Sequence, residues 1–186
     1  MNKTIKVKSE KKMTGTVLAV VSKITDKSLP LYTEILRRMK AGLPFMEYVR
    51  EFNKLCKVRE QFVDNLDPKV GRTMIANNLT SSSPTNDMQV NYTALGTGTT
   101  SPANVDVALE TETYRKETAS AVNADNVAYI SAFYSASEVN GTFRECGLFS
   151  DATGVTDSGI LVVRSAINIT KQNTETLTID HSLTIS

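Results

Sequence analysis

The sequence predicts a mainly β protein, with a β-sandwich-like C-terminal domain that follows an N-terminal α/β extension containing one or two amphipathic helices. From Val90 onward, short runs rich in Val, Ile, Thr, Tyr and Phe alternate with Gly, Asn, Asp and Ser, which is typical of sandwiches and barrels. Between Leu31 and Cys56, apolar residues recur at helical spacing instead. The charges divide in the same way. Residues 1–70 contain 15 Lys or Arg and 8 Asp or Glu, a net charge of +7, whereas residues 71–186 contain 6 and 12, a net charge of −6.

The N-terminal region is predicted to span residues 1–80 and to anchor or assemble the protein. Met1 to Lys12 carry five lysines, which fits a short edge strand or an arm that orders on a partner. Thr16 to Ser22 is apolar and β-branched enough for a buried strand. A strand from Val58 to Val63 and a short helix from Val70 to Leu79 are also expected.

The helical stripe in this region is predicted to be an assembly face rather than a cofactor site. Gly42 and Pro44 interrupt the stripe, so it forms one helix or two short ones. Two roles stay open, because the stripe could cover the β-domain of its own chain or join equivalent helices of neighbouring copies. The residues of the predicted face are Tyr32, Ile35, Leu36, Met39, Phe45, Tyr48, Val49 and Phe52.

The acidic C-terminal domain is predicted to span residues 81–186, after an exposed loop from Thr80 to Asp87. Asn140-Gly141 is a dipeptide favoured in tight hairpin turns. In the last strand apolar and polar residues alternate, which places His181 on the apolar face as a buried imidazole. The expected strands are Gln89 to Leu95, Thr113 to Val122, Val127 to Ser135, Thr142 to Phe149, Ile160 to Ile169 and Thr176 to Ile185.

No catalytic, cofactor-binding or metal-binding residues can be nominated, so we expect a protein that is not an enzyme and has no cofactor. The segment Gly96-Thr97-Gly98-Thr99-Thr100 lacks both the third glycine of a dinucleotide fingerprint and the lysine of a P-loop, so it is interpreted as a tight connection. Asp151 and Asp157 are interpreted as solvated loop acids. Spacing fixes no catalytic pair among the carboxylates Glu110, Glu112, Glu117, Glu138 and Glu145.

Two cysteines are too few and too far apart for a disulfide framework or a metal knuckle, so Cys56 and Cys146 are expected to be buried free thiols. The apolar run Val17 to Val21 is far shorter than the roughly 20 residues of a membrane-spanning helix, so no membrane partner is expected. Nucleic acid is not an expected partner either, although clustered lysines can bind phosphates.

Five segments in order carry a resemblance to a known family. They are Val70-Gly71-Arg72-Thr73, the stretch from Tyr92 to Ala103 with its Leu-Gly-Thr-Gly-Thr-Thr core, Glu112-Thr113-Tyr114-Arg115-Lys116, Asn140-Gly141-Thr142-Phe143 leading into Glu145-Cys146-Gly147-Leu148-Phe149, and the apolar alternating strand at the end. With these segments, the chain from Val70 onward resembles bacteriophage and prophage virion proteins described as tail-fibre, baseplate or minor structural proteins.

The resemblance implies a β-sandwich-like module that is repeated around a phage particle and works by assembly. We therefore expect a homo-oligomer that contacts other virion proteins, has no small-molecule substrate and is located in the virion. Tail, baseplate, fibre-attachment and collar positions all stay open. The alternatives are a carbohydrate or host-receptor binding module of a tail fibre, and a capsid decoration or head-fibre protein.

Overall fold

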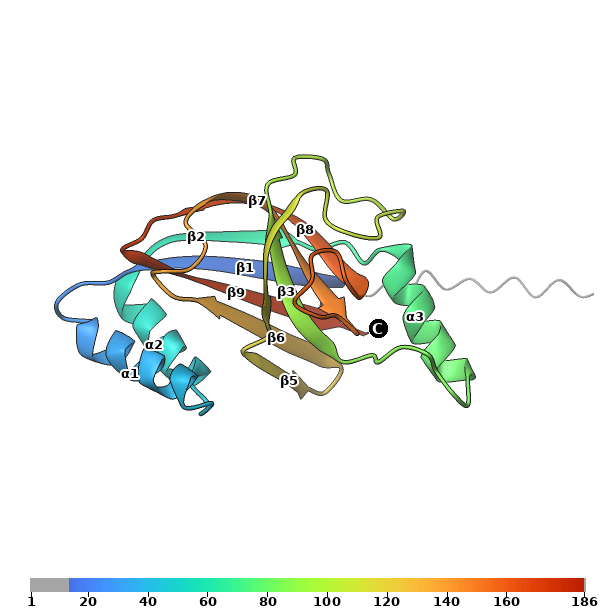
Figure 1. Ribbon diagram of the computed structural model, residues 1–186, viewed down its shortest axis with the longest axis horizontal. Helices are drawn as coiled ribbons and strands as arrows, with labels where there is room; N and C mark the ends of the chain where they lie inside the picture. The colour runs from blue at the N-terminus through green and yellow to red at the C-terminus, as the bar shows by residue number, and fades with distance from the viewer. Residues whose placement is uncertain (1–13, 186) are drawn as a thin grey trace, which may run out of the picture.

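The computed structural model describes residues 14–185, and these form two antiparallel sheets with three helices at their periphery (Figure 1). The prediction of a mainly β, sandwich-like fold is confirmed. The expected edge strand or arm at Met1 to Lys12 lies outside the described residues.

The first sheet has five strands in the order β2-β1-β9-β6-β5. Every neighbouring pair in it is antiparallel. Its members are β1 (Thr14–Lys23), β2 (Lys57–Asp64), β5 (Ser120–Ala124), β6 (Val127–Tyr134) and β9 (Glu175–Thr184).

The second sheet has four strands in the order β4-β3-β7-β8 and is also antiparallel throughout. Its members are β3 (Val90–Gly96), β4 (Glu112–Glu117), β7 (Gly141–Ser150) and β8 (Ile160–Lys171).

The core lies between the two sheets because side chains on a strand point alternately to its two faces. Leu177 and Ile179 of β9 are fully buried against residues of the second sheet such as Cys146 of β7 and Ile167 of β8. Burial of each large apolar side chain contributes about 1.5–3 kcal/mol to stability. The alternation predicted for the last strand is therefore present, with β9 one residue earlier than expected.

Strand β1 lies inside the first sheet, between β2 and β9. It pairs with β9 along its whole length, from Thr14 opposite Thr184 to Lys23 opposite Glu175. The predicted N-terminal region and the predicted β-domain therefore share one sheet, and strand pairing crosses the boundary predicted at residue 80.

Helices α1 (Leu29–Lys40) and α2 (Met46–Cys56) form the predicted helical region as two short helices, separated by a turn in which Gly42 has a φ of 64°. They pack on the outer face of the first sheet, where Phe133 of β6 joins their apolar cluster. The Ala136 backbone N–H donates to the Tyr32 hydroxyl at 3.1 Å.

Most residues of the predicted assembly face therefore pack against the first sheet of their own chain. Ile35, Val49 and Phe52 are fully buried, and Tyr32 is nearly so. Met39, Phe45 and Tyr48 are partly buried against the same cluster, whereas Leu36 stays 38% exposed. Of the two roles left open by the sequence, this is the one in which the stripe covers the sheet of its own chain.

Helix α3 (Lys69–Thr80) lies at the other end of the molecule, as Figure 1 shows, and packs through Met74 against Val162 of β8. It matches the short helix expected there. Its first turn is tied to the loop between β3 and β4, because the Lys69 backbone N–H donates to the Asn104 carbonyl at 2.9 Å.

Two sequence predictions about connections are wrong. The single strand expected from Thr113 to Val122 is split into β4 and β5, because the chain leaves the second sheet after Glu117 and joins the first at Ser120. Asn140-Gly141 is not a hairpin turn, because β6 and β7 lie in different sheets and do not pair. In both places the prediction rested on a local feature of the sequence, a dipeptide or a run of strand-forming residues. The sheet that a strand joins depends instead on residues far away in the sequence.

Candidate functional site

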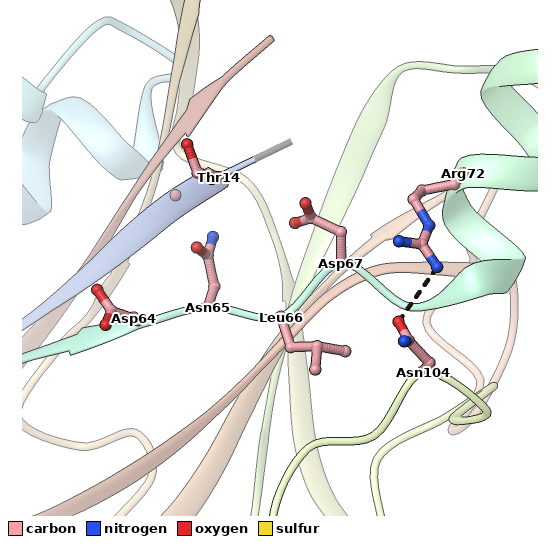
Figure 2. Close-up of a pocket in the computed structure, with 8 residues that line it drawn as sticks. Thr14, Asp64, Asn65, Leu66, Asp67, Arg72 and Asn104 are labelled. Carbon is pink, nitrogen blue, oxygen red and sulfur yellow. Dashed lines mark hydrogen bonds between the residues drawn. The ribbon is translucent and has the colours of Figure 1, made fainter. Parts of the chain in front are cut away.

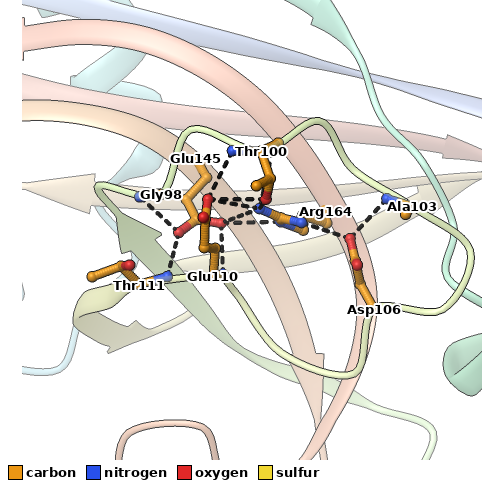
Figure 3. A network of polar contacts seen from close by, with 8 residues as sticks. All are labelled: Gly98, Thr100, Ala103, Asp106, Glu110, Thr111, Glu145 and Arg164. Atoms are coloured by element: carbon orange, nitrogen blue, oxygen red, sulfur yellow. Dashed lines mark hydrogen bonds and ion pairs between the residues drawn. The ribbon is translucent and has the colours of Figure 1, made fainter.

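The long loop between β3 and β4, residues 97–111, is held in place by one buried carboxylate (Figure 3). Glu145 of β7 is only 1% exposed and lies on the outer face of the second sheet. Its carboxylate accepts hydrogen bonds from the backbone N–H groups of Gly98 at 3.0 Å, Glu110 at 3.0 Å and Thr111 at 2.8 Å. Both ends of the loop are thus fastened to the same side chain.

Arg164 of β8 completes this arrangement and fastens the middle of the loop. Its Nε donates to Glu145 at 3.0 Å, its Nη1 to the Asp106 carboxylate at 2.6 Å and its Nη2 to the Thr100 carbonyl at 3.2 Å. Burial on its own would lower the Arg164 pKa, but the hydrogen bond to Asp106 and the nearby Glu145 carboxylate outweigh it and raise this pKa. The guanidinium therefore keeps its charge.

Glu110 adds a further contact within the loop. Its carboxylate accepts from the Thr100 backbone N–H at 2.7 Å and from the Thr100 hydroxyl at 2.9 Å. These hydrogen bonds, led by that of the backbone, lower the pKa of Glu110. The loop is consequently closed on itself as well as pinned to the sheet.

The glycines of the Gly-Thr segment leave space for the Glu145 carboxylate rather than for a phosphate. A Cβ atom on Gly96 would lie 2.5 Å from Glu145 Oε1, and one on Gly98 would also clash with that oxygen. The Glu145 carboxylate therefore occupies the space next to both glycines. The interpretation of this segment as a tight connection agrees with this geometry.

The pinned loop presents two apolar side chains to solvent. Val105 is 83% exposed and Val107 is 67% exposed. They line a groove of about 380 Å³ whose other wall is Lys69, Val70 and Thr73 of α3. An apolar surface on a rigidly held loop is a feature of interaction sites.

A polar cavity of about 420 Å³ lies beside this groove, at the ends of β1 and β2 (Figure 2). Asp67 is only 7% exposed, and its Oδ1 has no hydrogen-bond partner among the described residues. Both side-chain polar atoms of Asn65 are buried without a partner as well. Burial raises the pKa of Asp67 to about 6, and the charge of Arg72 only partly offsets this.

The other carboxylates noted in the sequence are engaged in separate contacts. Glu112 forms a buried ion pair with Arg115 at 2.6 Å, and Glu138 binds Lys116 at 2.6 Å. Glu117 is exposed. Of the five carboxylates, the structure thus brings only Glu110 and Glu145 to one network, where Arg164 lies between them.

The predicted loop acids Asp151 and Asp157 are exposed and have φ angles of 50° and 58°. Left-handed backbone of this kind is one that Asp adopts more readily than most residues, so they serve the turns. Within residues 14–185, no group of three or more His, Cys, Asp or Glu is placed to hold a metal ion.

His181 is buried as predicted, and so is Cys146, whereas Cys56 is only partly buried. Burial lowers the pKa of His181 to about 3 and raises the pKa of Cys146 to about 12. His181 therefore stays neutral, and Cys146 stays a protonated thiol, near neutral pH. In the described part of the chain, no helix is long and apolar enough to cross a bilayer.

Comparison with protein-family models, with curated proteins and with solved structures found no match to this chain.

Sequence reasoning missed the pairing of Glu145 with Arg164 and the cavity around Asp67. A signal for the first was present, because Arg164 interrupts an apolar run and Glu145 stands between Phe143 and Cys146. A charge in a buried strand needs a partner of opposite charge. The sequence carries no comparable signal for the cavity, since Asn65 and Asp67 fall in a segment that resembles any polar turn.

Proposed function

We propose that this chain is a structural subunit of a tailed-bacteriophage virion, at a tail, baseplate, fibre-attachment or collar position, and that it acts by assembling with copies of itself and with other virion proteins. In this proposal it catalyses no reaction. The observation that carries the proposal is the pinned loop of residues 97–111 with its exposed apolar residues Val105 and Val107.

Two of the five segments behind the family resemblance meet at this loop. The Gly-Thr segment forms its first part, Glu110 and Thr111 close it, and Glu145 belongs to another of the resembling segments. What these segments share is therefore the construction of a surface loop with a fixed shape. This supports a common mode of assembly rather than a common reaction.

The physics of association favours such a loop. Binding costs conformational entropy when a mobile segment must be ordered, and a loop that is already fixed by buried hydrogen bonds avoids most of that cost. The exposed valines then contribute the apolar area that drives contact between subunits. The adjacent groove along α3 offers a complementary depression for an apolar side chain of the neighbour.

A carbohydrate-binding role gains less support from the aromatic residues. Of the seven aromatic residues in strands β3 to β9, Tyr129 alone is well exposed, at 42%, and Phe143 and Phe149 are buried. Phe133 and Tyr134 are fully buried, and Tyr92 and Tyr114 are partly buried. A single exposed ring is a poor stacking platform for sugars.

The test is the self-association of the full chain with Val105 and Val107 both changed to Ser. We expect wild-type protein to form a defined oligomer by light scattering, and the double variant to raise its dissociation constant by about tenfold or more, because two apolar side chains leave the interface. Val155→Ser is the matched control, since Val155 is 68% exposed on a different loop.

Equal self-association of all three proteins would mean that the loop is not the contact. A wild-type protein that stays monomeric at every concentration would overturn self-assembly. Detection of the chain in several copies per particle, by mass spectrometry of purified tailed virions, tests the virion location separately.

A further inference from the structure

The polar cavity beside α3 has the composition of a binding site for a charged group. Its walls come from Thr14 and Gly15 of β1, from Asp64 at the end of β2, from Asn65 and Asp67 in the segment that follows, and from Arg72 of α3. Figure 2 shows the side chains of Asn65 and Asp67 on the side of their segment that faces Thr14. The segment itself is rigid, because Leu66 exchanges two backbone hydrogen bonds of 3.0 Å with Arg164.

Three buried atoms in this cavity need hydrogen-bond partners. They are Asp67 Oδ1 and the Oδ1 and Nδ2 atoms of Asn65. Buried polar groups are rarely left unpaired, because each has lost its hydrogen bonds to water without a replacement. Two of the three atoms are acceptors, so the occupant must bring hydrogen-bond donors above all.

The charges indicate that the occupant is a single cation on a flexible stem. Asp64, Asp67 and Arg72 give the walls a net charge of −1, and Arg72 already donates to Asn104 Oδ1 at 3.1 Å. A divalent metal ion fits badly, because the walls supply only two carboxylates and a guanidinium stands beside them. An ammonium group carries one charge and three donors.

The sequence of this chain has such ammonium groups directly before Thr14, the first residue of the cavity wall. Residues 1–13 lie outside the described structure and contain five lysines. Lys12 and Lys11 precede Thr14, a wall residue, by two and three positions. At most about 3.6 Å per residue separates them along the chain, so each lysine can reach the cavity without help from a neighbouring molecule.

We propose that this cavity is the docking site for the basic N-terminal segment of the same chain, with the ammonium group of Lys11 or Lys12 bound to the Asp67 carboxylate. Docking fixes where the lysine-rich segment leaves the β-sandwich, beside α3 and the loop of residues 97–111. This inference does not depend on the proposed virion function.

Limited proteolysis of the full chain with trypsin tests the docking. In wild-type protein, cleavage after Lys11 and Lys12 should be slow. In Asp67→Asn it should become about tenfold faster or more, since a hydrogen bond between two charged groups is lost. Cleavage after Lys27, an exposed turn residue, gives an internal reference, and Asp157→Asn removes an exposed carboxylate elsewhere as the matched control.

The outcomes separate clearly when intact masses are followed over time. Equal cleavage rates after Lys11 and Lys12 in wild type and Asp67→Asn overturn the proposal. Protection that grows with protein concentration also overturns it, because the segment would then come from a second copy. Protection that is independent of concentration and lost only in Asp67→Asn supports docking within one chain.

A second measurement tests the docking without changing Asp67, so that it does not depend on how Asp67→Asn affects the fold. The double variant Lys11→Gln/Lys12→Gln changes only residues that precede the first described strand. If a lysine binds Asp67, the carboxyl resonance of Asp67 should titrate at higher pH in the double variant than in wild type. Identical titration curves would mean that neither lysine occupies the cavity.

Discussion

Glu145 and Arg164 show how two single residues can determine the shape of a whole loop. Each is a charged residue in a strand whose other buried positions are mostly apolar. A buried charge is tolerated only when it is paired and hydrogen-bonded. Apart from the hydrogen bond within the pair, every side-chain hydrogen bond of Glu145 and Arg164 to the described residues goes to residues 97–111. The hydrogen bonds that the buried pair requires therefore hold the loop in one conformation.

Removing one partner of this pair should be costly. We expect Glu145→Ala to lower the free energy of unfolding by about 3–5 kcal/mol, because Arg164 would remain buried with one of its two close counter-charges gone. Urea unfolding followed by circular dichroism measures this. Glu117→Ala, at an exposed position, should stay within about 0.5 kcal/mol of wild type. A Glu145→Ala variant as stable as the control would contradict the role given to the network.

The burial of His181 predicts how the free energy of unfolding depends on pH. Its pKa is lowered to about 3 in the folded protein by burial alone, whereas the unfolded chain takes up a proton near pH 6.5. Below pH 6.5 the unfolded state thus binds more protons than the folded state. The free energy of unfolding should fall by up to about 1.4 kcal/mol for each pH unit between pH 6.5 and pH 4.

The comparison with His181→Leu isolates this contribution, because other groups also titrate in that range. Asp67, for example, has a folded pKa raised to about 6, so its contribution to stability grows as the pH falls toward 4 and opposes that of His181. The difference between wild type and His181→Leu, measured by urea unfolding at pH 7 and pH 4.5, should favour the variant more at pH 4.5. An unchanged difference would show that His181 is not buried as a neutral imidazole.

At the scale of helices and strands, the sequence predicted elements well where their signals are local. The interruption at Gly42 and Pro44 indicated that the stripe could form two short helices, and the alternation from Leu177 to Leu183 indicated the last strand. It failed where the signal is not local. Nothing between Thr113 and Val122 shows that the chain changes sheets, because this depends on Ser131 and Asn91, whose backbone carbonyls accept hydrogen bonds from Ala119 and Thr118.

The same limit applies to the two candidate surfaces. Spacing along the chain cannot place Glu145 next to Gly98, because strands β3 and β7 are 45 or more residues apart and their register includes a bulge. The cavity around Asp67 needs β1, the segment after β2 and α3 to meet. Strand partners decide both surfaces, and a single sequence does not reveal strand partners.

At the scale of the whole molecule, the order of strands argues that residues 14–185 fold as one unit. The first described strand, β1, pairs with the last, β9, and with β2 on its other side. Without β1 and β2, strand β9 would become the edge of a three-stranded sheet. The core side chains Val17, Ala19 and Val21, all fully buried, would be lost at the same time.

A chain that begins at Ser81 should therefore fail to fold. We expect no cooperative thermal transition by circular dichroism, and aggregation by light scattering, because the exposed β9 edge and the open core invite association between chains. A chain that begins at Thr14, and so keeps both strands, is the control and should unfold cooperatively. If the chain from Ser81 instead unfolds cooperatively as a monomer, residues 81–186 are an independent domain, as the change in charge and composition near residue 80 predicts, and β1 and β2 are an addition to it.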